Sequence, residues 1–203
     1  MAETHNQRQK DIIISRDIKG LIFDMDGTLL NSTPVHYQAW LSACQPFGVS
    51  FDYDFFITLT GRPVIELARD LIARYELAVT PMDLVAHKES LVEDNLNKVT
   101  LIPAVFDVLE RYRGLLPMAV GTGASRQRAE RLLRSSGIED RFKAIVTSDD
   151  VSHYKPHPET FLNAAAALGV APADCLVFED GHLGIEAAKA AGMQVIDVKP
   201  YYD

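Results

Sequence analysis

The chain has 203 residues, of which 47% are hydrophobic and 24% are charged, which is typical of a folded globular protein. Its formal net charge of −8, with 20 basic and 28 acidic residues and no basic run, argues against a nucleic-acid-binding surface. The two cysteines, Cys44 and Cys175, form no CxxC motif, so neither a zinc site nor a disulfide scaffold is expected. No long apolar run suggests a membrane segment, and we expect a cytoplasmic protein.

The first strong strand signal, at about Gly20–Asp24, ends abruptly at acidic residues. Leu-Ile-Phe runs into Asp24 and Asp26, and Gly27 then permits a tight turn. An apolar run that stops at carboxylates indicates a buried strand reaching the edge of a sheet, where open α/β sheets bind ligands. Upstream, Ile12–Ile14 predicts either a short strand or a hydrophobic tether in an otherwise polar N-terminal extension.

Residues 33–100 show helical spacing and no strand alternation. Helices are expected to begin near Pro34, Pro63 and Pro81, because proline suits the first turn of a helix. The first of these helices is expected to place Phe47 on its apolar face, whereas Phe51–Leu59 has mixed character. The pattern predicts an all-helical domain inserted after the first strand.

From residue 101 onward, strand and helix signals alternate. The expected strands lie at about 117–121, 143–147, 175–178 and 193–198. This alternation implies right-handed crossovers and a parallel sheet with helices on both faces. We therefore predict an α/β, Rossmann-like fold in which residues 18–32 and 101–203 form one domain, residues 33–100 form an inserted helical domain, and residues 1–17 form an N-terminal extension.

Polar groups suited to phosphate and a cation follow several of these strands. They are Thr122, Gly123, Lys155, Glu179 and Asp180. Carboxylate oxygens suit Mg²⁺, and a helix N-terminus with a hydroxyl and backbone N–H groups suits a phosphoryl oxygen. A lysine supplies positive charge for phosphate or braces the first acid. Singly, each has an ordinary explanation as a cap, a surface lysine or a turn, but together they predict one site.

The motifs resemble, in their order along the chain, those of the haloacid dehalogenase superfamily of phosphohydrolases. They are Asp24-Met-Asp26-Gly-Thr28, then Thr122, then Lys155-Pro, then Glu179-Asp180. The helical insert resembles the family's cap, and the chain is most similar to the β-phosphoglucomutase-like branch. The run Met118–Gly123 resembles bacterial sugar phosphatases of the fructose-1-phosphate phosphatase type.

The resemblance implies a phosphoric monoester hydrolase with an aspartyl-phosphate intermediate. Asp24 would attack phosphorus, and Asp26 would protonate the leaving oxygen and later activate water. Mg²⁺ would be held by Asp24, the backbone carbonyl of Asp26 and Asp180, with Glu179 as a ligand or a supporting partner. Thr122, Gly123 and Lys155 would bind the phosphoryl oxygens.

The expected substrate is a small sugar phosphate, fructose-1-phosphate-like, and the protein is expected to be a monomer or a weak homo-oligomer. His36 and Lys88 resemble cap residues of the phosphomutase, whereas Arg62 is displaced from the mutase's cap arginine position, which Val64 occupies. A phosphatase is therefore favoured over a β-phosphoglucomutase-type mutase. A non-hydrolytic phospho-accepting module is a second alternative, but it would not need a helical lid.

Three further histidines lie near the expected site. They are His153, His157 and His182. They could rim it, but polar loop histidines ordinarily have no special role.

Overall fold

The computed structural model describes residues 12–59 and 64–202. The chain divides into two units, of which one comprises the described residues up to Leu29 and from Leu101 onward, and the other spans Leu30–Thr100. None of the helices within the described ranges is long and apolar enough to span a membrane.

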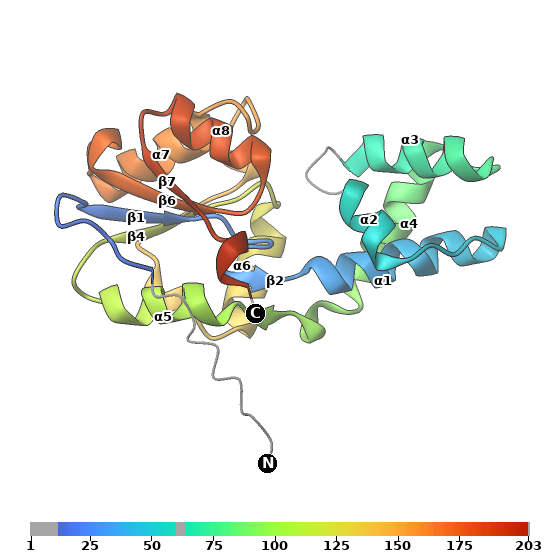
Figure 1. Cartoon of the computed structure of the whole chain (residues 1–203), viewed down its shortest axis with the longest axis horizontal. Coiled ribbons are helices and arrows are strands. Elements are labelled where there is room, and N and C mark those ends of the chain that lie inside the picture. Colours follow the sequence, from blue (N-terminus) through green and yellow to red (C-terminus); the bar gives the residue numbers. More distant parts are fainter. Residues whose placement is uncertain (1–11, 60–63, 203) are drawn as a thin grey trace, which may run out of the picture. The chain divides into compact units, whose positions relative to one another are not determined.

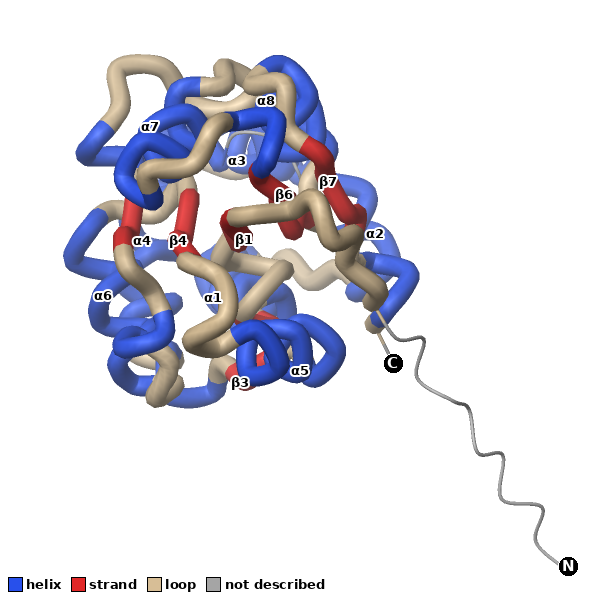
Figure 2. Tube along the Cα trace, turned by 90° about the vertical axis from the view of Figure 1, so that its left-hand side faces the viewer, coloured by secondary structure: helices blue, strands red, loops and turns tan. Residues whose placement is uncertain are grey.

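The first unit is built on a five-stranded sheet with the order β5-β4-β1-β6-β7. Its strands are β1 (Gly20–Phe23), β4 (Met118–Gly121), β5 (Ala144–Val146), β6 (Cys175–Glu179) and β7 (Gln194–Asp197). All neighbouring strands pair in parallel. Figure 2 shows β4, β1, β6 and β7 side by side in this order. The predicted parallel sheet is confirmed, and β1 and β6 are buried throughout, as apolar central strands should be.

Helices lie on both faces of this sheet, as predicted. They are α5 (Pro103–Tyr112), α6 (Arg126–Ser135), α7 (Glu159–Leu168) and α8 (His182–Ala190). Figure 1 shows α7 and α8 on one face and α5 on the other. Beneath α7 and α8, Phe161 and Ala187 pack with Ile22 and Val177 of the central strands in one buried cluster. This core fixes where β1 and β6 end, and therefore where the acids that follow them lie.

The second unit is helical apart from its ends. Its helices are α1 (Thr33–Cys44), α2 (Tyr53–Leu59), α3 (Val64–Tyr75) and α4 (Pro81–Glu93). Trp40, Leu71 and Leu84 are buried in its core. Two short strands, β2 (Leu30–Asn31) and β3 (Thr100–Leu101), pair where the chain enters and leaves the unit. The helical pattern did not predict this pairing, because two-residue strands carry no periodicity.

Two local predictions in the second unit are wrong. The segment Phe51–Leu59 does not have mixed secondary structure, because most of it forms the helix α2. This helix begins after Asp52, whose carboxylate accepts the backbone N–H of Phe55 at 2.7 Å in a capping arrangement. Phe47 is not buried, and 38% of its surface is exposed, because α1 ends at Cys44 and a 3₁₀ turn (Gln45–Phe47) changes the helical phase.

The Ile12–Ile14 segment is not a strand. Ile12 and Ile14 are buried, with 3% and 8% exposed, whereas Ile13 is 85% exposed. Arg111 of α5 donates from Nη1 to the carbonyl oxygen of Ile12 at 3.3 Å. The burial of Ile12 and Ile14 agrees with the interpretation of this segment as a hydrophobic tether. Their side chains attach it to the first unit.

Candidate active site

The ends of β1 and β6 and the loop after β5 meet in one buried ion cluster. Because Phe23 pairs with Phe178, Asp24 follows β1 beside Glu179, the last residue of β6. Lys155 donates from Nζ to Asp24 Oδ1 at 2.7 Å and to Glu179 Oε1 at 2.8 Å. One ammonium group therefore bridges two carboxylates that are 131 and 24 residues away in the chain.

Burial dominates the electrostatics of this cluster. Burial raises the pKa of the Asp24 carboxyl well above its ordinary value; Lys155 acts against this shift, and the nearby charges of Glu179 and Asp180 reinforce it. Burial also opposes a charge on Lys155, but the Asp24 and Glu179 carboxylates outweigh it and raise the pKa of Lys155. Burial, followed by repulsion from Glu179, raises the pKa of Asp180 to about 6. The acids therefore need more positive charge than Lys155 alone supplies.

This arrangement fits a divalent cation. Ligand oxygens of Asp24, Glu179 and Asp180 all lie within 4.8 Å of one another. When all three carboxylates are ionised, their charge exceeds that of the one ammonium bonded to them, and Lys199 acts only at longer range on Asp180. An all-oxygen donor set suits a hard cation such as Mg²⁺ or Ca²⁺. Gly27, at φ +81°, brings its backbone so close that a Cβ atom there would stand 2.6 Å from Asp180 Oδ2. Glycine is needed at this turn for both reasons.

Both carboxylate oxygens of Glu179 accept hydrogen bonds from the protein. Its Oε1 accepts from Lys155, and its Oε2 accepts the backbone N–H of Gly181 at 2.5 Å. Gly184, in the first turn of α8, leaves room for it, because a Cβ atom at that position would overlap the carboxylate. Asp180 is held more lightly, by the Thr28 hydroxyl at 3.3 Å from its Oδ1.

Asp26 has a basic partner that sequence reasoning missed. Arg128, from the first turn of α6, donates from Nη2 to Asp26 Oδ1 at 3.2 Å. The two side chains are partly buried, with 15% of Arg128 and 29% of Asp26 exposed. No sequence signal identified this contact, since the residues are 102 positions apart and arginines recur along α6.

Thr122 and Gly123 lie just after β4, at the start of the turn into α6. Thr122 is buried, and its Oγ1 accepts the backbone N–H of Ala124 at 3.1 Å, which leaves the hydroxyl proton to donate elsewhere. At Gly123, a Cβ atom would meet nothing within 4 Å, so the backbone there is open to a ligand. Because β4 pairs with β1, these groups lie at the same sheet edge as Asp24.

The predicted cap residues fall into two groups. His36 and Lys88 come together inside the second unit, where Lys88 Nζ lies 3.0 Å from His36 Nδ1 and 2.8 Å from Glu89 Oε1. Lys88 is only 3% exposed and lies 5.5 Å from the Trp40 ring centroid. Arg62 lies outside the described residues.

Comparison with known proteins agrees with this geometry. A sequence model of haloacid dehalogenase-like hydrolases matches residues 21–198, a span that includes every site residue named above. This protein is a haloacid dehalogenase-like hydrolase. Enzymes of this family typically use a divalent metal ion, and the acid set at the ends of β1 and β6 fits one.

Relatives of this hydrolase include enzymes that act on phosphate esters. Fructose-1-phosphate phosphatase YqaB from Escherichia coli is 42% identical over 181 residues, covering 89% of this chain and 96% of that protein. β-Phosphoglucomutase from Bacillus subtilis is 31% identical, covering 89% of this chain and 83% of that protein. The crystal structure of CbbY from Rhodobacter sphaeroides in complex with phosphate superposes with a TM-score of 0.70 at 25% identity, covering 88% and 84% of the two chains. The predicted family and fold are confirmed.

Proposed function

We propose that this hydrolase is a Mg²⁺-dependent phosphatase that hydrolyses a sugar phosphate resembling fructose 1-phosphate, through an aspartyl phosphate on Asp24. The observation that carries the proposal is the buried Lys155 bridge between Asp24 and Glu179, with Asp180 beside it. The similarity to the Escherichia coli fructose-1-phosphate phosphatase supports the choice of substrate class.

The reaction proceeds in two steps on the protein's own side chains. In the first, an Asp24 carboxylate oxygen forms a bond to phosphorus while the bond from phosphorus to the sugar oxygen breaks, and Asp26 gives that oxygen its proton. In the second, water attacks phosphorus and Asp26 takes the water proton. The Asp24–phosphorus bond then breaks, and inorganic phosphate leaves.

The remaining groups neutralise and position the phosphoryl oxygens, which is most of what phosphoryl transfer requires. Thr122, the backbone N–H of Gly123 and Lys155 are proposed to bind these oxygens. Mg²⁺, when bound, neutralises charge on the transferred group, and Asp24, Asp180 and the Asp26 carbonyl are its proposed ligands.

We assign Glu179 a supporting role in place of direct metal binding. Both of its oxygens already accept hydrogen bonds from the protein, from Lys155 and from Gly181. Glu179 is also more buried, at 3% exposed, than the partly exposed Asp180. Glu179 therefore fixes Lys155 and the turn that presents Asp180.

Residues 33–100, which lie within the second unit, are proposed to be the substrate-selecting cap, and residues 18–32 and 101–203 the catalytic core. Within the proposed cap, His36 and Lys88 offer two nitrogen groups 3.0 Å apart, a pair suited to sugar hydroxyls or phosphate. Arg62 remains a proposed third contact.

The proposal is tested by measuring phosphate release from a panel of sugar phosphates with and without Mg²⁺, alongside an isomerisation assay with β-glucose 1-phosphate. We expect Mg²⁺-dependent phosphate release that is fastest with ketose 1-phosphates, and no net isomerisation. Asp24→Asn is expected to abolish release, because an amide is a poor nucleophile, whereas Asp107→Asn on the exposed side of α5 leaves it unchanged. Isomerisation without phosphate release, or turnover by Asp24→Asn, would overturn the proposal.

A further inference from the structure

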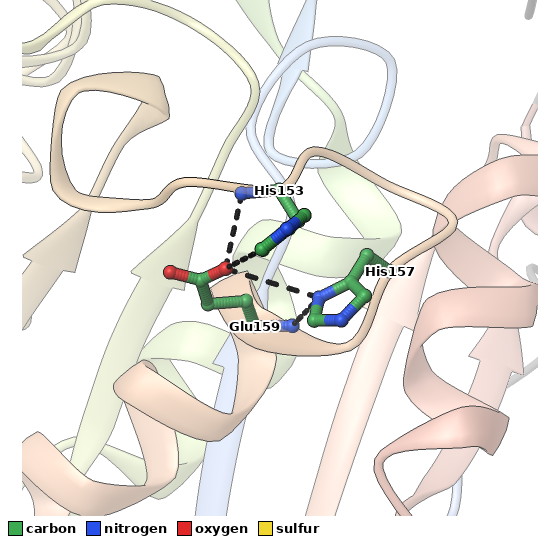
Figure 3. Close-up of side chains that lie close together, drawn as sticks. All are labelled: His153, His157 and Glu159. Atoms are coloured by element: carbon green, nitrogen blue, oxygen red, sulfur yellow. Dashed lines mark hydrogen bonds and ion pairs between the residues drawn. The ribbon is translucent and has the colours of Figure 1, made fainter.

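A second cluster of metal-ligating side chains lies in the first unit, in the loop that carries Lys155. It consists of His153, His157 and Glu159, which Figure 3 shows facing one another where the loop joins α7. Glu159 Oε2 lies 2.9 Å from His153 Nδ1 and 3.9 Å from His157 Nδ1. All three ligand atoms lie within 4.8 Å of one another.

These separations suit a tetrahedral transition-metal ion. With bonds of about 2.0–2.1 Å, ligand atoms of a tetrahedral zinc site lie roughly 3.3 Å apart. The distances of 2.9 and 3.9 Å bracket that separation, so small side-chain rotations would equalise them. Two imidazoles and one carboxylate are a donor set for zinc-like ions, whereas the all-oxygen donor set at the ends of β1 and β6 suits harder cations.

The carboxylate of this cluster is already held in place and ionised. Its Oε1 accepts the backbone N–H of Ser152 at 2.9 Å, and its Oε2 accepts that of His153 at 3.0 Å. The backbone bond from Ser152, followed by the contact with the His153 side chain, lowers the pKa of Glu159. Such bonds behind a ligand orient it for a metal.

The imidazoles are accessible, and each would exchange one present hydrogen bond for a bond to the metal. His157 Nδ1 accepts the backbone N–H of Glu159 at 3.3 Å, so that nitrogen is unprotonated, and a metal would take the lone pair that now accepts this hydrogen bond. His153 Nδ1 faces a carboxylate and therefore donates a proton to it, and metal binding would release that proton to solvent. The side chains of His153 and His157 are 66% and 50% exposed, which leaves space for a water molecule to complete the coordination.

We propose that His153, His157 and Glu159 form a binding site for a zinc-like divalent cation, distinct from the acidic site at the ends of β1 and β6. Lys155 lies between the two histidines in sequence and donates to Asp24. An ion held on both sides of Lys155 therefore restrains the loop that delivers this lysine to the candidate active site.

The test measures zinc binding by calorimetry to the untagged full-length chain in saturating Mg²⁺, which keeps the acidic site occupied. We expect one equivalent of Zn²⁺ to bind wild type, and the affinity to fall at least tenfold in His153→Ala and His157→Ala, because each loses a direct ligand. His182→Ala is the matched control, since His182 pairs with Glu186, at 3.5 Å on α8, and belongs to no three-ligand group among the described residues.

Two further measurements separate this site from the acidic one. Asp180→Asn should retain the zinc equivalent, and Co²⁺ bound to wild type should give the absorption bands of a tetrahedral ion, which His157→Ala should lose. Equal affinity in wild type and both histidine variants, or loss of zinc binding in Asp180→Asn alone, would overturn the proposal. The binding measurement uses no substrate, so its outcome is independent of the proposed phosphatase activity.

Discussion

Lys155 favours the ionised form of Asp24, which is the form that can act as a nucleophile. Burial raises the pKa of Asp24, and a protonated Asp24 would be a poor nucleophile. The ammonium at 2.7 Å favours the ionised form, and Glu179 holds that ammonium from the other side. A single lysine thus offsets part of the cost of burying acids at a strand end, and a cation is expected to offset the rest.

The raised pKa of Asp180 predicts how metal binding depends on pH. Because that pKa is about 6 in the folded metal-free protein and near 3.8 when unfolded, the folded state binds the extra proton between these values. The contribution of Asp180 to the stability of the metal-free protein is therefore greatest below about pH 4, and it is lost as the pH rises to 6. A cation that binds the ionised carboxylates reverses this loss, so Mg²⁺ should raise the melting temperature more at pH 7.5 than at pH 5.

Differential scanning calorimetry with and without Mg²⁺ at the two pH values checks this expectation. Asp180→Asn is the control, because it removes the titrating group and should flatten the difference. An equal Mg²⁺ effect at both pH values in wild type would contradict it.

The Arg128–Asp26 contact predicts a coupled effect on turnover. A hydrogen bond between charged groups is worth about 1.5–3 kcal/mol, so Arg128→Ala should lower kcat about tenfold or more if the bond positions Asp26 for proton transfer. In an Asp26→Ala background, Arg128→Ala should cost nothing further, because its partner is gone. Steady-state kinetics on the four proteins measures this coupling.

Arg134→Ala provides the comparison on the same helix. Arg134 pairs with Glu139 at an exposed site, where ion pairs contribute little. Additive losses from Asp26→Ala and Arg128→Ala would show that Arg128 acts elsewhere.

At the scale of elements, the first turn of α8 packs directly against the side chain of Glu179. Gly184 lies inside this helix, where alanine would ordinarily be favoured by about 1 kcal/mol. The Glu179 carboxylate, however, occupies the space that an alanine methyl group would take. The close packing of helix and strand end explains a glycine that helical propensity disfavours.

Gly184→Ala should therefore be destabilising despite its helical preference. Displacing Glu179 is expected to cost about 1–3 kcal/mol in unfolding free energy and to lower kcat, because Lys155 loses a partner. Urea denaturation and phosphate-release assays measure the two effects. Lys189→Ala, on the exposed side of α8, should leave both unchanged, and a stabilised, fully active Gly184→Ala would disprove the packing argument.

At the scale of the whole molecule, the first unit is assembled from segments on either side of the helical insert. The N-terminal segment packs on the first unit through every second isoleucine, since Ile12 and Ile14 are buried and Ile13 is exposed. The contact from Arg111 to the Ile12 carbonyl anchors the same segment to α5.

This alternation makes a three-variant stability test possible. Ile12→Ala and Ile14→Ala should each lower the unfolding free energy by about 2 kcal/mol or more, because each leaves a cavity. Ile13→Ala should change it by no more than about 0.5 kcal/mol. Chemical denaturation midpoints compare the three, and equal effects would mean that the segment is not packed as described.

The sequence by itself determined the family, the parallel sheet and the acids at the ends of β1 and β6. Those features follow from local patterns, since an apolar run that stops at Asp24 marks both a buried strand and its end. Only the tertiary structure decided that Arg128 contacts Asp26 and that Phe47 lies outside the helical core. It also decided that His153, His157 and Glu159 face one another. Such contacts depend on helix phase, side-chain direction and the packing of distant segments, and no short stretch of sequence encodes these.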